Sequence, residues 1–175
     1  MSNAWNDSSQ LRGLLARYEY MFPLSGETRP YAFYRGWAPQ FAALCEQVDA
    51  ILTVNKRGFH WTRIREKFGA PSFAYRMRGQ ARFAINSHRP FSVSRVECAP
   101  RESFDSAAVS VQEMVLQTEI RLRNACIVCG ANSEITNVQG PWVSLCPDHQ
   151  GPDFLQELHA RGQSLWTACK LSLDA

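Results

Sequence analysis

The sequence lacks the segments that would place the chain in a membrane or send it out of the cell. No apolar run approaches the about 20 residues that a helix needs to cross a bilayer. The first ten residues, MSNAWNDSSQ, contain neither the basic nor the apolar region of a secretory signal. Low-complexity tracts and internal repeats are absent too. With 175 residues, 45% of them hydrophobic, the chain is expected to form a globular core in the cytoplasm.

Motifs for catalysis are also missing. The sequence has no nucleophile elbow, no glycine-rich phosphate loop and no acidic pair at a telling spacing. His60, His88 and His159 stand alone, without the partners that a second, open metal position of a nuclease would need. The sequence therefore predicts a protein that is not an enzyme.

Four residues near the C-terminus have the spacing of a metal site. Cys126 and Cys129 lie in CIVCG, and Cys146 and His149 lie in LCPDH, sixteen residues further on. Zn²⁺ prefers a tetrahedral shell of thiolate and imidazole ligands, and a closed set of four is typical of structural sites. We expect one structural Zn²⁺ per chain. The alternative is that these cysteines are free thiols in the core.

The residues between the two ligand pairs are expected to form a hairpin. Strands over residues 134–138 and 142–145 are joined by the turn formers Gln139, Gly140 and Pro141. The chain would thus form a knuckle (residues 126–130, CIVCG), then the hairpin, and then a second ligand pair at the start of a helix. This is the order of elements in a treble-clef-like zinc site. Gly151 and Pro152 interrupt that helix, so the second pair is expected on an isolated turn.

The remaining pattern predicts an α+β fold with a small antiparallel sheet packed with helices. Helices are expected from Ser8 or Ser9 to before Pro23, over residues 39–54 and 105–124, and from Pro152 past Gly162. Residues 1–125 would form the body, and residues 126–175 the zinc module and a last helix packed on it. Glu119 and Arg123 are expected as an outward i,i+4 pair. The remaining cysteines, Cys45, Cys98 and Cys169, are expected to be reduced and mostly buried.

A basic hairpin precedes the long helix. Strands are predicted over residues 59–68 and 73–78, with further strands over 83–85 and 91–97. Pairing Phe68 with Phe73 puts Arg65 opposite Arg76, and like charges across a ladder are destabilising. The same register places Glu66 on the apolar face. The outward side would hold the candidate partner-binding residues Trp61, Arg63, Arg65, Lys67, Arg76 and Arg78.

The charge distribution gives this hairpin two interpretations. Residues 56–82 carry a balance of +7, so the rest of the chain, whose total is +3, carries −4. Either the basic face serves an anionic partner, or it is a solvated face whose cations pair with acids elsewhere in the chain. Residues 22–37 likewise hold several aromatic rings, which either pack over the core or form a recognition surface.

Two phrases give the chain a resemblance to known sequences. Residues 63–69, RIREKFG, precede an aromatic strand, and CIVCG is followed by Gly-Pro-Trp and LCPDH. In these places the chain resembles small uncharacterised bacterial proteins with a zinc knuckle, many from phages and other mobile elements. The resemblance covers about residues 59–78 and 115–149 and implies a zinc site beside a hairpin. It implies no established activity.

Two functions fit these observations. The first is a zinc-stabilised protein-binding domain whose basic face meets an acidic protein surface, as in a toxin-immunity or counter-defence protein of a mobile element. The alternative is a nucleic-acid-binding protein whose basic hairpin tracks phosphates while Trp61 stacks on a base.

Overall fold

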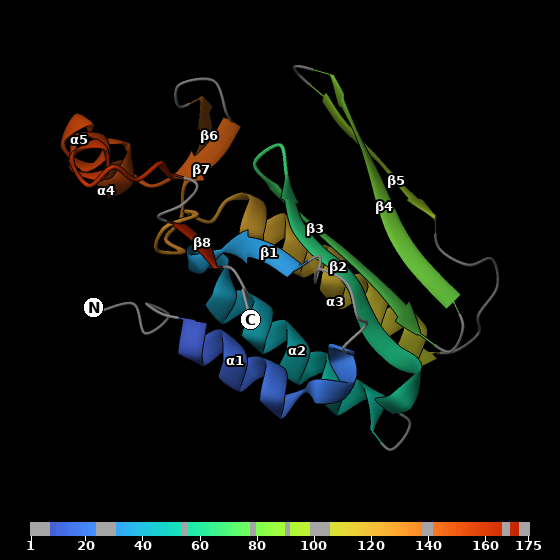
Figure 1. The fold of residues 1–175 in the computed structure, drawn as a ribbon. Coiled ribbons are helices and arrows are strands. Elements are labelled where there is room, and N and C mark those ends of the chain that lie inside the picture. The colour runs from blue at the N-terminus through green and yellow to red at the C-terminus, as the bar shows by residue number, and fades with distance from the viewer. Residues whose placement is uncertain are drawn as a thin grey trace.

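A six-stranded sheet backed by helices makes up most of the protein (Figure 1). The computed structural model describes residues 8–23, 31–53, 56–77, 80–89, 92–98, 106–137, 142–165 and 169–171. The strand order is β5-β4-β3-β2-β1-β8, and a separate two-stranded sheet pairs β6 with β7. Within these residues no helix is long and apolar enough to cross a membrane.

The elements follow each other in an α+β order. The strands are β1 (Tyr31–Tyr34), β2 (Phe59–Lys67), β3 (Ala70–Met77), β4 (Gln80–Arg89), β5 (Ser92–Cys98), β6 (Glu134–Asn137), β7 (Trp142–Leu145) and β8 (Lys170–Leu171). The α-helices are α1 (Ser8–Arg17), α2 (Ala38–Leu52), α3 (Ser106–Arg123), α4 (Pro147–Gln150) and α5 (Pro152–Ala160). Short 3-10 turns are η1 (Glu19–Met21), η2 (Arg35–Trp37) and η3 (Lys56–Gly58).

The α+β class is confirmed, and three details of the predicted fold differ from expectation. The sheet is mixed, because β1 pairs in parallel with β2 across the α2 crossover. The predicted break after residue 85 is wrong, because β4 continues to Arg89 and pairs with β5 along its length. Helix α5, which was expected to run from Pro152 past Gly162, ends at Ala160. The two-residue β8 returns the chain to the sheet edge beside β1.

An aromatic cluster fills the space between the sheet and α2. The ring of Phe41 on α2 lies 5.5 Å from Trp61 and 5.2 Å from Phe73, measured between centroids. From the aromatic segment of residues 22–37, Phe22 and Trp37 are buried in the same core. For these two residues the core interpretation is therefore correct; the side chains of residues 31–33 lie outside the described part.

The β2–β3 hairpin closes on a tighter turn than expected. Lys67 pairs with Ala70, so the loop consists of Phe68 and Gly69 alone, with φ of 53° and 79°. Positive φ at both positions is the requirement of a type I′ turn, whose twist matches that of the strands. The predicted pairing of Phe68 with Phe73 is wrong by four residues. A slip by an even number of residues leaves the side chains of residues 63–67 on their predicted faces but changes their partners.

The true register removes the like-charge conflict. Arg63, Arg65 and Lys67 face small residues of β3, in the pairs Arg63–Ala74, Arg65–Ser72 and Lys67–Ala70. Glu66 also loses its apparent conflict, because its carboxylate accepts the backbone N–H of Gly69 at 2.5 Å and ties the turn together.

A β-bulge between Trp61 and Arg63 corrects the place of Trp61. The extra residue shifts the alternation along β2, so that Phe59, Trp61 and Ile64 all face the core. Trp61 is 1% exposed and packs against Phe59 and Tyr75 as well as Phe41. Its predicted place on the outward basic face is wrong, because without the bulge the alternation would have aligned it with Arg63 and Arg65.

Helix α3 covers the open edge of β3. Strand β4 pairs with only the C-terminal part of β3, which leaves the N–H of Phe73 without a strand partner. The carboxylate of Glu119 accepts that N–H at 2.7 Å, and Glu119 is 2% exposed. The predicted outward position of Glu119 beside Arg123 is therefore wrong. The carboxylate on α3 therefore supplies the acceptor that a neighbouring strand would supply elsewhere in a sheet.

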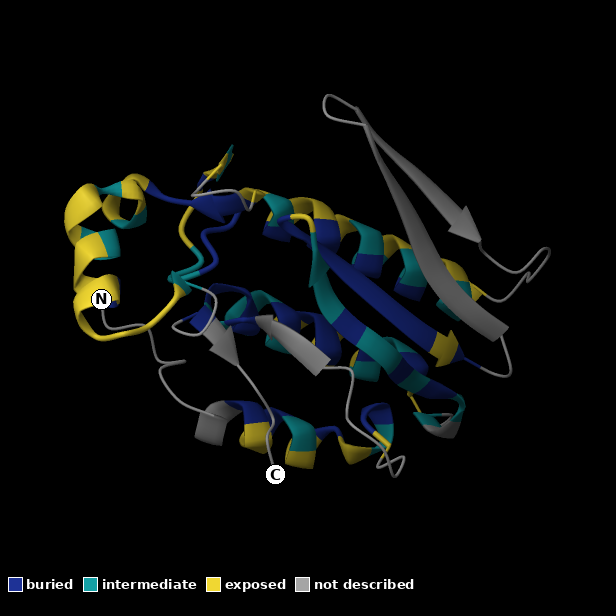
Figure 2. Ribbon diagram, turned by 45° about the horizontal axis from the view of Figure 1, so that its top comes forward, coloured by how far each residue is buried: buried dark blue, intermediate teal, exposed yellow. Residues whose placement is uncertain are grey.

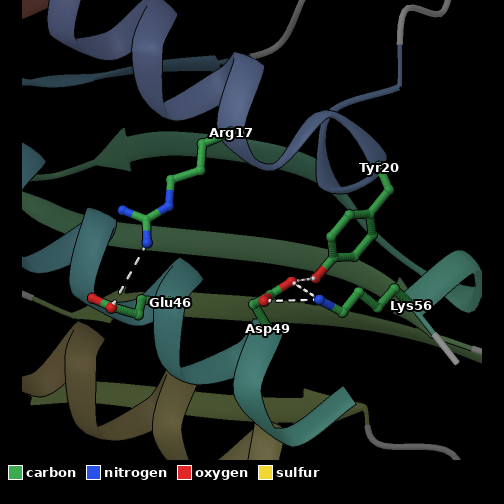
Figure 3. Close-up of polar contacts among 5 residues, drawn as sticks. All are labelled: Arg17, Tyr20, Glu46, Asp49 and Lys56. Atoms are coloured by element: carbon green, nitrogen blue, oxygen red, sulfur yellow. Dashed lines mark hydrogen bonds and ion pairs between the residues drawn. The ribbon is translucent and has the colours of Figure 1, made fainter. Parts of the chain in front are cut away.

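A polar cluster joins η1, α2 and η3 at the end of the helical layer (Figure 3). Asp49 accepts from the Tyr20 hydroxyl at 2.7 Å and from Lys56 Nζ at 2.9 Å. Burial raises the pKa of Asp49, but its bonds to Lys56 and Tyr20 outweigh burial, so the pKa lies below its ordinary value. Nearby, Arg17 and Glu46 form a looser ion pair at 4.0 Å between exposed side chains.

We expect Asp49→Asn to lower the free energy of unfolding at neutral pH by up to about 1 kcal/mol, since the cluster is partly exposed. A lowered pKa stabilises the folded state above the unfolded pKa, and this contribution disappears as pH falls through the folded value. The gap between wild type and variant should therefore shrink below about pH 4. Urea titrations across pH measure it, with Glu46→Gln as the matched control of small effect. A gap that widens on acidification would contradict the assignment.

Candidate metal centre

Three thiols and one imidazole converge where α3, the knuckle and α4 meet. The ligand atoms of Cys126, Cys129, Cys146 and His149 all lie within 4.8 Å of one another. The Sγ atoms of Cys129 and Cys146 are 3.7 Å apart, and Cys126 Sγ lies 3.6 Å from His149 Nδ1. Cys146 Sγ and His149 Nδ1 are closer, at 3.1 Å. These four residues could hold one metal ion.

The first ligand pair sits on a tight turn after α3. The N–H of Gly130 donates to the carbonyl of Cys126 at 2.8 Å, and the N–H of Cys126 donates to Ala131 at 2.7 Å. Gly130 has φ of 79°, a conformation that L side chains rarely adopt. The turn brings both sulfurs to one side.

The second ligand pair sits on the single turn α4, as its interruption by Gly151 and Pro152 predicted. Cys146 lies between β7 and α4, and its carbonyl accepts the N–H of His149 at 2.9 Å. The ring of Phe154 on α5 meets the His149 ring edge-to-face, with centroids 4.7 Å apart. Beyond this contact, α5 is largely exposed (Figure 2).

The β6–β7 hairpin connects the two ligand pairs and packs inward through β7. Val143 and Leu145 are fully buried. The carbonyl of Ser144 accepts from Ile127 at 2.9 Å, and its hydroxyl donates to the Arg123 carbonyl at 2.7 Å. The knuckle, the hairpin and the end of α3 are thus joined by direct hydrogen bonds.

Backbone contact joins the knuckle to the body at Gly36. The Gly36 N–H donates to the Ile127 carbonyl at 3.0 Å. A Cβ at Gly36 would lie 2.1 Å from the Cys126 carbonyl oxygen and 2.6 Å from the Gly130 nitrogen. Beside it, the buried Trp37 donates from Nε1 to the Ala125 carbonyl at 3.3 Å. Only glycine allows this approach.

Burial favours the protonated forms of two of the thiols, Cys129 and Cys146. Burial, and then the neighbouring thiols, raise the pKa of Cys146 to about 12. Burial also raises the pKa of Cys129 and lowers that of His149. A metal ion that binds thiolates must therefore release protons, so its affinity should fall with falling pH.

Two of the remaining thiols are inert by the same argument. Cys45 and Cys169 are buried, as expected. Burial raises the pKa of both, in Cys169 to about 12. A thiol that stays protonated is a poor nucleophile. The side chain of Cys98 lies outside the described residues.

The basic residues stand apart from the metal cluster, on the outward face of β2 and β3. Arg63, Arg65 and Lys67 are partly exposed and Arg76 is exposed. Among the described residues no carboxylate forms an ion pair with any of the three arginines. Arg78 lies outside the described residues.

Two exposed aromatic residues escaped the sequence analysis. Phe68 is 60% exposed and Trp142 is 55% exposed. A Cβ on Gly69, next to Phe68, would lie 2.6 Å from the Trp142 carbonyl oxygen, so the hairpin turn touches β7. The two residues are 74 positions apart, and no local pattern indicates that their backbone segments adjoin.

No family model, curated protein or solved structure matches this chain.

We expect Gly36→Ala to weaken both the fold and the retention of metal, because its Cβ would force the knuckle away from the body. The expected loss is at least about 2 kcal/mol, comparable to overpacking a tight core site. Gly13→Ala is the control: Gly13 lies on exposed α1 with nothing within 4 Å of a Cβ. The control should be neutral or gain up to about 1 kcal/mol. Equal behaviour of the two variants in denaturant titration would contradict the contact.

Proposed function

We propose that this chain is a zinc-stabilised protein-binding domain without enzymatic activity, whose partner presents an acidic surface. The observation that carries the proposal is the row of cations on the outward face of β2, in which Arg63 and Arg65 form no ion pair with a described acidic residue. The metal centre supports a scaffolding role, since four protein ligands leave no open position for water or substrate.

The donor set and its spacing favour Zn²⁺. A tetrahedral site with Zn–S of about 2.3 Å and Zn–N of about 2.0 Å has S···S near ~3.8 Å and S···N near ~3.5 Å. The separations of 3.7 Å for Cys129–Cys146 and 3.6 Å for Cys126–His149 agree with these values, and that of 3.1 Å for Cys146–His149 is shorter. The order knuckle, hairpin, short helix supports a treble-clef-like arrangement.

We expect about one zinc per chain by elemental analysis. Cys146→Ser should lose the metal and lower the free energy of unfolding by several kcal/mol, because metal affinity at such a site is folding free energy. Cys45→Ser is a matched control, a buried thiol outside the cluster that should keep its zinc. Full stability of the Cys146 variant without zinc would contradict a structural site.

The geometry of the basic face fits a protein partner. Side chains two apart on a strand point the same way at about 6.6 Å spacing, so Arg63, Arg65 and Lys67 form one row. Arg65 Nε is buried without an acceptor among the described residues. Because Trp61 is buried, the base-stacking contact of the nucleic-acid alternative loses its residue. Masking an acidic functional site on another protein is the biological role we favour, as in toxin neutralisation or counter-defence.

The basic face can be tested with polymers, since the natural partner is unidentified. Arg63→Glu with Arg65→Glu should weaken binding of fluorescent poly-glutamate by roughly tenfold or more at low salt, because two attractive contacts become repulsive. Arg12→Glu with Arg17→Glu on α1 reverses the same number of charges elsewhere and should change binding less than about twofold. Tighter binding of oligothymidine than of poly-glutamate, lost in the first double variant, would instead favour the nucleic-acid function.

A further inference from the structure

We infer that Phe68 and Trp142 form an aromatic anchor at the end of the basic row, and that the partner segment is an acidic polypeptide carrying aromatic side chains. This inference rests on the proposed protein-binding function and names what its partner must present. Two observations carry it: the conformation of Phe68 and the junction between the hairpin turn and β7.

Phe68 occupies a backbone conformation that a phenylalanine rarely adopts. Its φ is 53°, and the first position of a type I′ turn normally holds Asn, Asp or Gly. A bulky residue there is strained. The side chain is 60% exposed, so burial within the chain returns little for that strain. Strain held at an exposed aromatic residue points to a use outside the folded monomer.

The junction at Gly69 holds the two aromatic residues on adjoining backbone segments. The carbonyl of Trp142 lies against Gly69 at a distance that admits no Cβ. Figure 1 shows the tip of the β2–β3 hairpin reaching towards the β6–β7 hairpin. The N–H of Gly69 is held by Glu66, so the turn is fixed from both sides. Trp142, at 55% exposure, adds a second large ring at this place.

The charges around the anchor select an acidic occupant. Lys67 Nζ lies 5.7 Å from the centroid of the Phe68 ring, within cation–π range. Arg65 is the next outward residue on β2, so the anchor continues directly into the basic row. Aromatic residues with Arg at their rim are the usual composition of interaction hot spots. Glutamates of a partner would meet the row while its aromatic side chains pack on Phe68 and Trp142.

The experiment compares two acidic polymers by fluorescence anisotropy: poly-glutamate and a random copolymer of glutamate and tyrosine. The zinc-loaded wild type should bind the copolymer about tenfold more tightly. Phe68→Asn should remove that preference, leave poly-glutamate binding within about twofold, and keep or raise Tm by up to about 5 °C, since Asn tolerates positive φ. Trp142→Ser should remove the preference as well. Val109→Asn, which alters an equally exposed apolar side chain on α3, is the matched control and should change nothing.

The possible results distinguish a failure of the aromatic anchor from a failure of the proposed protein-binding function. A wild-type copolymer preference that survives Phe68→Asn and Trp142→Ser overturns the aromatic anchor and leaves the basic face standing. Equal binding of both polymers by the wild type does the same. No binding of either polymer at low salt overturns the proposed function, and the anchor with it. Tighter binding of oligothymidine than of the copolymer overturns the acidic polypeptide as the occupant.

Discussion

The packing of the metal site against the body depends on one close contact, in which the backbone of Gly36 lies against that of the knuckle, residues 126–130. At this point the backbone between β1 and α2 lies directly against the backbone that carries Cys126 and Gly130. Because no side chain intervenes, the metal centre, the end of α3 and the start of α2 hold one another in a single arrangement. We therefore expect a substitution of a candidate metal ligand to lower the stability of the main sheet as well as that of the C-terminal residues.

A second close approach of two backbone segments lies at the other end of the metal module. Gly69 meets the Trp142 carbonyl, so the hairpin of the main sheet is seated against the hairpin that lies between the two ligand pairs. The candidate metal site adjoins the strand that carries Trp142, while the type I′ turn carries Phe68 on the neighbouring backbone segment. The proposed interaction surface spans both sheets, and we propose that a metal bound by the four residues would hold the β6–β7 hairpin in place within it.

Local patterns predicted the features whose cause is local. The spacing of Cys126, Cys129, Cys146 and His149 indicated the cluster, because two short turns bring each pair together whatever the rest of the chain does. The apolar periodicity of α2 and α3 likewise indicated helices. The faces of β2 and β3 were largely correct for the same reason, since alternation is a property of the extended backbone itself.

The candidate metal ligands, the helices, the α+β class and the excess of positive charge on one hairpin could all be predicted from the sequence alone. The strand register, the bulge and the contacts between distant segments depend on the tertiary structure. The bulge after Trp61 and the two-residue turn at Phe68 arise because the sheet must twist while burying its aromatic rings. Neither feature changes the local hydrophobic pattern enough to be predicted from the sequence. Glu119 has the spacing of an outward ion pair, yet it turns inward because β3 presents an N–H that its neighbouring strand leaves unbonded. The close approach of Gly69 to the Trp142 carbonyl depends on packing between segments far apart in the chain, which composition and periodicity do not encode.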